Sequence, residues 1–169
     1  MITFLKRFLV TILILLVLVQ FYPKDKPNIS EAVSANEISI QYTVPDSVHA
    51  ILKASCYDCH SNNTVYPWYS KIQPVAWWLN SHITDGKNEL NFSEFTTYRI
   101  GKQYRKLKAI NDEVKKGDMP LSSYTLIHRY AKLDDAQKLL IATWATAIEE
   151  SIKIQYPMDS LISKKQRTL

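Results

Sequence analysis

The sequence has few of the residues on which several common kinds of protein depend. Its 169 residues include only two cysteines and three glycines. Two cysteines cannot form a four-thiolate zinc site, and the scattered histidines His49, His82 and His128 do not supply the close pair that a two-cysteine, two-histidine site needs. Scarce glycine, together with ten tyrosines and an apolar fraction of 46%, argues against a low-complexity or disordered chain. The net charge of +5 is modest, and no motif indicates nucleic-acid binding.

The N-terminal region has the layout of an export signal. Lys6 and Arg7 precede an almost continuously apolar run over 8–19, and residues 20–23 close it. Neighbouring apolar residues extend this run toward the ~20 residues that a bilayer needs. The only small-residue cleavage site, at 33–35, lies far downstream, which favours an uncleaved signal-anchor over a cleaved signal peptide. We therefore expect an anchor over 1–23 in the inner membrane of a bacterium, with the rest in the periplasm. A soluble periplasmic protein is the alternative.

The two cysteines belong to one motif, Cys56-Tyr57-Asp58-Cys59-His60. C-x-x-C-H is the attachment signature of c-type haem, because two thiols at this spacing reach the two vinyl groups of one porphyrin. The histidine that follows is then held beneath the ring as the proximal iron ligand. A thioredoxin-like redox pair is the alternative, but it requires a βαβ context that the sequence does not show. We predict one covalent haem on Cys56 and Cys59, with His60 on the iron.

The remaining pattern is helical, and no alternating pattern predicts a strand of useful length. Polar and proline residues over 24–45 predict a tether, 46–152 the haem domain and 153–169 a tail. Helices are expected from Asp46 or Ser47 to Cys56, from Pro74 to His82 before a turn at 84–87, over 98–116, and from Asp134 through the apolar positions 140, 141, 144, 145 and 148. The aromatic stretch 66–78 is expected to lie mostly in the core and around the haem. The predicted fold is all-α: a small cytochrome c-like domain around one haem.

A methionine in the second half of the chain is the candidate distal ligand. Met119 follows Gly117, which stands where a helix C-terminal glycine belongs, and precedes Pro120. A thioether in such a loop is a soft iron ligand that raises the reduction potential. His82 is the alternative, since an imidazole could take the same position, although a lone histidine on a helix is more often packed or hydrogen-bonded. His49 and His128 are weaker candidates.

Several of these segments together resemble the bacterial "haem-binding domain" family, small exported proteins with a single C-x-x-C-H motif. The resemblance rests on 56–64, 66–69, Pro74, 77–79, His82, 90–95, Gly117, 119–121, Tyr124 and Trp144. It covers roughly residues 45 to 150. The resemblance implies c-type haem binding, and it brings no defined reaction with it.

These observations lead to an expected function. The chain is predicted to be a monohaem c-type cytochrome-like protein that transfers electrons to or from an unidentified redox partner, and it is expected to be a carrier rather than an enzyme. One alternative is a haem-based enzyme or gas sensor with a displaceable sixth ligand. The other is a binding or assembly module in which the haem is structural.

Overall fold

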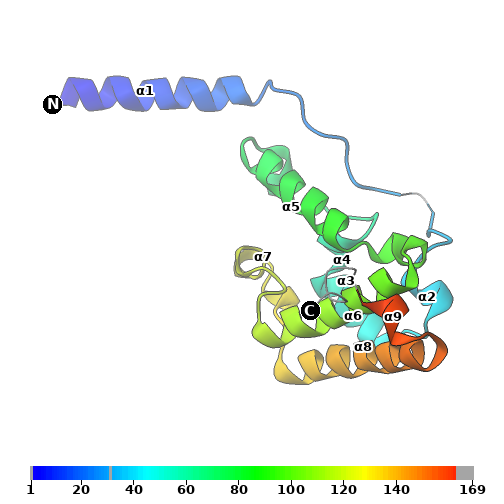
Figure 1. Ribbon diagram of the computed structural model, residues 1–169. Coiled ribbons are helices and arrows are strands. Elements are labelled where there is room, and N and C mark those ends of the chain that lie inside the picture. Colours follow the sequence, from blue (N-terminus) through cyan, green and yellow to red (C-terminus); the bar gives the residue numbers. More distant parts are fainter. Residues whose placement is uncertain (1, 31, 163–169) are drawn as a thin grey trace.

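The computed structural model describes residues 2–30 and 32–162, and all regular structure among these residues is helical (Figure 1). The α-helices are α1 (Ile2–Val19), α2 (Ile38–Gln41), α3 (Asp46–Ser55), α4 (Tyr57–His60), α5 (Val75–Glu89), α6 (Ile100–Lys116), α7 (Ser122–Ile127), α8 (Asp135–Gln155) and α9 (Met158–Leu161). Short 3₁₀ turns lie at η1 (Trp68–Lys71), η2 (Phe92–Thr97) and η3 (Arg129–Ala131). The prediction of an all-α domain preceded by an apolar helix is confirmed.

The core of the domain forms where α6 and α8 pack along each other, with α3 against α8. The predicted stripe of α8 is buried at Ile141, Trp144, Ala145 and Ile148, while Leu140 is exposed. Asp134 and Gln137 form the predicted capping box at the start of α8. At the other helix, Gly117 ends α6 with a φ of 81°, a left-handed conformation that glycine adopts without strain. These local signals therefore position the two longest helices of the domain as expected.

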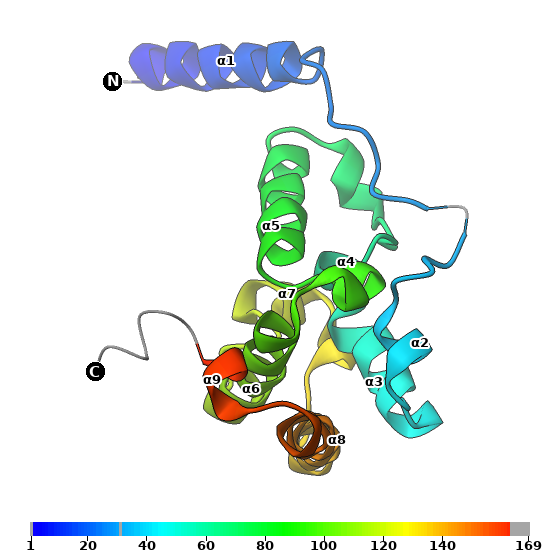
Figure 2. The same ribbon diagram turned by 45° about the vertical axis from the view of Figure 1, so that its right-hand side comes forward.

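The first helix stands apart from this core. No residue of α1 is buried, its mean hydropathy is 2.5, and it is long and apolar enough to cross a membrane. An export signal near the N-terminus has the same properties, so the helix is compatible with either an anchor or a signal. In Figures 1 and 2 it extends away from the helices of the domain.

The range expected to be a tether makes specific contacts with the domain. Ile38 is fully buried, and Tyr42 donates a hydrogen bond to Gln103 (2.6 Å). The side-chain amide of Asn28 donates to the Ser61 carbonyl (2.9 Å). Beyond α8, Leu161 of the expected tail is also fully buried, whereas 163–169 lie outside the described residues. The domain boundaries remain predictions, but apolar side chains on both sides of 46–152 contribute to its core.

Two expectations about the middle of the chain were wrong. The segment 84–87 is not a turn, because α5 continues as one helix to Glu89. The aromatic stretch is not mainly core either: Trp68 is 77% exposed, and Trp77 and Trp78 also face outward. Composition identifies such side chains as apolar, but the face on which they lie depends on how η1 and α5 pack against each other and how α5 packs against α4.

Candidate haem site

The haem motif begins where α3 ends. Cys56 leaves the helical conformation (φ −126°, ψ −40°), and α4 then turns through Tyr57 to His60. Tyr57 stacks on Phe92 at 5.3 Å between ring centroids, which fixes α4 against the core. Both cysteines are free thiols in this structure. The motif is thus held by packing rather than by a disulfide.

The two thiols do not have the environment of a redox pair. Burial raises the pKa of Cys56 to about 12, with a smaller effect from the nearby Cys59. Burial also raises the pKa of Cys59, to about 11, and the carboxylate of Asp58 adds to it. Redox-active cysteines instead have a pKa lowered toward neutrality, because the thiolate is the nucleophile. The structure therefore gives the thioredoxin-like interpretation no support.

His60 is oriented by two backbone carbonyls. Its Nδ1 lies 2.9 Å from the carbonyl oxygen of Gly86 and 2.9 Å from that of Leu90. Carbonyl oxygens only accept hydrogen bonds, so Nδ1 carries the proton and the lone pair of Nε2 is left available. Burial, the largest influence, lowers the pKa of His60 and favours the neutral ring. A neutral imidazole whose second nitrogen is fixed by a carbonyl is the usual form of a metal-binding histidine.

Gly86 allows α5 to approach the haem motif. A Cβ atom at this position would lie 2.6 Å from the carbonyl oxygen of Cys59 and 3.1 Å from its Cβ. The glycine is therefore required for close contact, and its own carbonyl is one of the two that hold His60. This role of Gly86 was not predicted, because 84–87 was expected to be a turn. A glycine in a helical pattern is a signal of close packing only when the neighbouring element is known.

Replacing Gly86 by alanine is expected to separate α5 from α4. The added methyl group meets backbone atoms, which cannot move as a flexible side chain could, so the free energy of unfolding should fall by about 1–3 kcal/mol. Chemical denaturation measures this change, and the yield of haem-loaded protein should fall with it. Thr84→Ala, at an exposed position of the same helix, is the matched control and should change stability by less than about 0.5 kcal/mol. Equal stability of Gly86→Ala and the wild type would contradict the packing argument.

Two adjoining cavities of about 300 and 180 Å³ surround the motif. Both are bordered by Cys56, His60 and Met119, and Cys59 borders the smaller one. The larger cavity has an apolar wall contributed by Phe92, Ile110, Val114, Leu133 and Ile141. A porphyrin is a flat apolar ring that needs such walls, two thiols at its edge and a histidine for its iron. The residues present therefore fit a haem.

The rim of the larger cavity carries an ion pair. Lys106 Nζ lies 2.9 Å from Glu89 Oε2, and the two residues come from α6 and α5. The Lys106 ammonium lowers the pKa of the exposed Glu89 carboxyl. The cavity is therefore lined by apolar side chains and has charged groups at one edge. A haem has a similar distribution, with an apolar ring and carboxylates at its margin.

The two candidate distal ligands occupy different positions. Met119 is half-buried, follows the end of α6 and borders both cavities. His82 borders only the smaller cavity; its Nδ1 contacts the Trp78 carbonyl (2.9 Å), and its ring packs on Trp78 at 4.4 Å. Which of the two binds iron stays a prediction. The structure brings Met119 together with Cys56, Cys59 and His60.

The remaining histidines contact tyrosine side chains. His128 Nε2 contacts the Tyr69 hydroxyl (2.6 Å), and its Nδ1 contacts the Tyr130 hydroxyl (3.0 Å). His49 is exposed and packs edge-on against Tyr57. Neither residue borders the two cavities.

A hydrogen bond joins the haem motif to the segment that follows Met119. Tyr124 of α7 donates from its hydroxyl to Asp58 Oδ2 (2.7 Å), and the other carboxylate oxygen accepts from the Val65 amide (2.9 Å). Burial, followed by this hydrogen bond, raises the pKa of Tyr124. The contact fixes the Met119 loop relative to α4. Sequence reasoning did not assign this role to Tyr124 or Asp58, because a contact across 66 positions leaves no local pattern.

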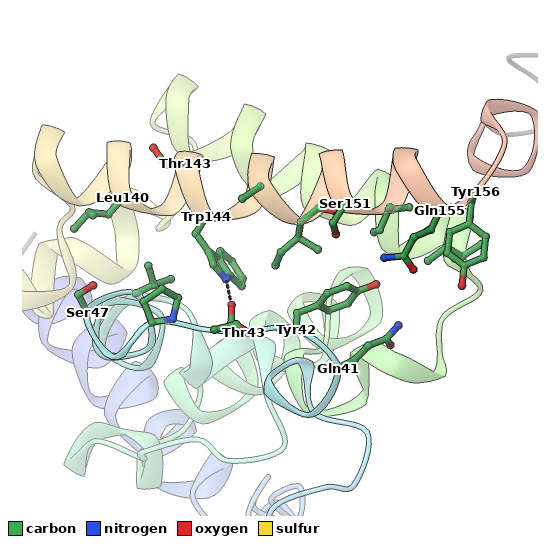
Figure 3. Close-up of a pocket in the computed structure, with 16 residues that line it drawn as sticks. Gln41, Tyr42, Thr43, Ser47, Leu140, Thr143, Trp144, Ser151, Gln155 and Tyr156 are labelled. Atoms are coloured by element: carbon green, nitrogen blue, oxygen red, sulfur yellow. Dashed lines mark hydrogen bonds between the residues drawn. The ribbon is translucent and has the colours of Figure 1, made fainter.

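A larger cavity lies elsewhere in the described structure. A groove of about 790 Å³ runs between α8 and the segment 41–48, where Trp144 Nε1 donates to the Thr43 carbonyl at 3.2 Å (Figure 3). None of the residues predicted to hold haem borders this groove. Volume alone therefore does not identify the site, whereas the chemistry of the bordering residues does.

The comparisons with known proteins agree with the geometry of the site. A family model described as "Haem-binding domain" matches residues 14–147. The chain therefore belongs to the haem-binding domain family, which confirms the resemblance found in the sequence, and it is a haem-binding protein. Among curated proteins and among solved structures, nothing matches.

Proposed function

We propose that the protein is a monohaem c-type cytochrome that carries electrons. One haem c is attached through Cys56 and Cys59, with His60 as the proximal ligand and Met119 as the distal ligand. The observation that carries this proposal is the meeting of these four side chains around two adjoining cavities. When bound, haem supplies a one-electron Fe(III)/Fe(II) couple.

The protein's own residues contribute rigidity and a low dielectric constant. His60 is held by two carbonyls, and the Asp58–Tyr124 hydrogen bond restrains the Met119 loop. If His60 and Met119 both stay bound to the iron, few atoms move when the iron gains or loses an electron. Such small rearrangement favours electron transfer. The apolar wall excludes water and so disfavours the more highly charged oxidised state. This combination supports a carrier rather than a catalyst.

The proposed location is the outer face of a bacterial inner membrane. Lys6 and Arg7 lie near the N-terminal end of α1. By the positive-inside rule, that end is the cytoplasmic one. The domain that follows α1 is then in the periplasm, where the thiols of a c-type motif receive their haem. The redox partner would meet the protein in that compartment.

A visible spectrum of the full-length protein tests the proposed function. Matured in a host with c-type haem machinery, the protein is expected to show low-spin iron in both oxidation states. Carbon monoxide added to the reduced form should leave the spectrum unchanged, because both axial positions are filled by side chains. High-spin iron that binds carbon monoxide readily would overturn the electron-carrier proposal and favour a sensor or enzyme.

A further inference from the structure

Residues 65–78 carry several apolar side chains that are exposed in the described structure. We call this group the aromatic patch: Val65, Trp68, Ile72, Val75, Trp77 and Trp78. Trp68 is 77% exposed and Trp78 is 45% exposed. The side chains come from η1, the first turn of α5 and the chain just before them. A group of large exposed apolar side chains close together in the chain is typical of a site of interaction with a protein or a membrane.

The end of the apolar helix α1 lies directly beside this patch. The Gln20 side chain donates from Nε2 to the Gln73 carbonyl (2.9 Å) and accepts from the Gln73 amide at Oε1 (3.0 Å). Two residues further on, Tyr22 packs edge-on against Trp77 at 5.1 Å. Figures 1 and 2 both show the end of α1 next to the beginning of α5. A membrane crossed by α1 would therefore end where the aromatic patch begins.

The chemistry of the patch suits the boundary between lipid and water. Tryptophan has a large apolar ring and one N–H donor, and it is enriched at this boundary in membrane proteins. Basic side chains accompany the ring systems: Lys24 Nζ donates to the Lys71 carbonyl (2.5 Å), and both lysines are exposed. Ammonium groups at the boundary between lipid and water attract the anionic headgroups of the bilayer.

We propose that the aromatic patch docks on the outer surface of the same bilayer that α1 crosses, so that the haem domain is held at the membrane in one orientation. This inference rests on the proposal that α1 is a retained anchor. The lipid interface is favoured over a protein partner because the patch is continuous with α1 through Gln20 and Tyr22.

Hydroxyl-radical footprinting of the full-length holoprotein tests this inference. The protein is placed in nanodiscs of phosphatidylethanolamine and phosphatidylglycerol, and oxidation of each side chain is measured by mass spectrometry. Tyr130, which is 67% exposed, and the buried Trp144 are the internal references. The oxidation of Trp68 should be several-fold lower than that of Tyr130 and close to that of the buried Trp144.

A pair of variants shows whether the patch itself makes the contact. In the triple variant Trp68→Ser, Trp77→Ser, Trp78→Ser, the patch residue Ile72 should no longer be protected from oxidation. The matched control Leu126→Ser, Ile127→Ser removes exposed apolar side chains from α7 and should leave that protection intact.

The outcomes separate this inference from the anchor proposal. A mature N-terminus downstream of Tyr22 would overturn both, and the same mass spectra report it. An intact chain in which Trp68 is oxidised as readily as Tyr130 would overturn the docking inference alone.

Discussion

Serine at both Cys56 and Cys59 is expected to abolish covalent haem attachment. Serine has nearly the same shape as cysteine but cannot form a thioether, so the change removes the bonds while leaving the packing of α4 in place. Haem staining after denaturing electrophoresis should fall from full intensity to none, and acid-acetone should extract all haem from the variant and none from the wild type. Each single variant should retain one thioether.

Ser55→Ala is the matched control for this experiment. Ser55 borders the same two cavities but contributes no thiol, so this variant should keep its covalent haem. The attachment proposal fails if the wild-type haem is fully extracted, or if the mature protein contains a disulfide between Cys56 and Cys59.

Met119 is expected to control the reduction potential. Met119→Leu preserves the volume of the side chain but removes the sulfur, so the potential should fall by on the order of 0.1–0.2 V, within the roughly 0.8 V over which axial ligands tune haem proteins. The weak charge-transfer band of ferric iron bound by a thioether, near the red edge of the visible spectrum, should disappear. The iron should also become open to carbon monoxide. Redox titration and absorption spectroscopy measure these changes.

His82→Ala provides the comparison for Met119. If Met119 is the ligand, the band and the potential should be preserved in this variant. The reverse result, with His82→Ala opening the iron and Met119→Leu silent, would show ligation by two histidines. That result would contradict the assignment of Met119 and leave the haem attachment standing.

Structural features that depend on residues close together in the chain were predictable from the sequence. The C-x-x-C-H motif, the glycine that ends α6 and the capping box of α8 each act through neighbours a few positions away. The apolar stripe of α8 also follows from periodicity alone. These features were sufficient for the all-α class. The roles of Cys56, Cys59 and His60 in holding haem stay predictions.

Features that depend on contacts between distant segments were not predictable in this way. Gly86 was interpreted as part of a turn, because only the approach of α5 to Cys59 reveals why a side chain is excluded there. The outward direction of Trp68 on η1 and of Trp78 on α5 also depends on how these elements pack against the rest of the domain. The contacts of Asn28 and Ile38 with the domain likewise join residues far apart in the chain.

The order of the cavity's parts along the chain has a consequence for assembly. The haem motif ends at His60, whereas Leu133 and Ile141 of the apolar wall come from the second half of the chain, and the fully buried Leu161 comes later still. A ribosome makes the chain from its N-terminus, so both thiols exist well before the wall that encloses them. A cofactor delivered before the chain is complete would thus meet an open half-site, and the packing of α8 and then of α9 would close the domain around it.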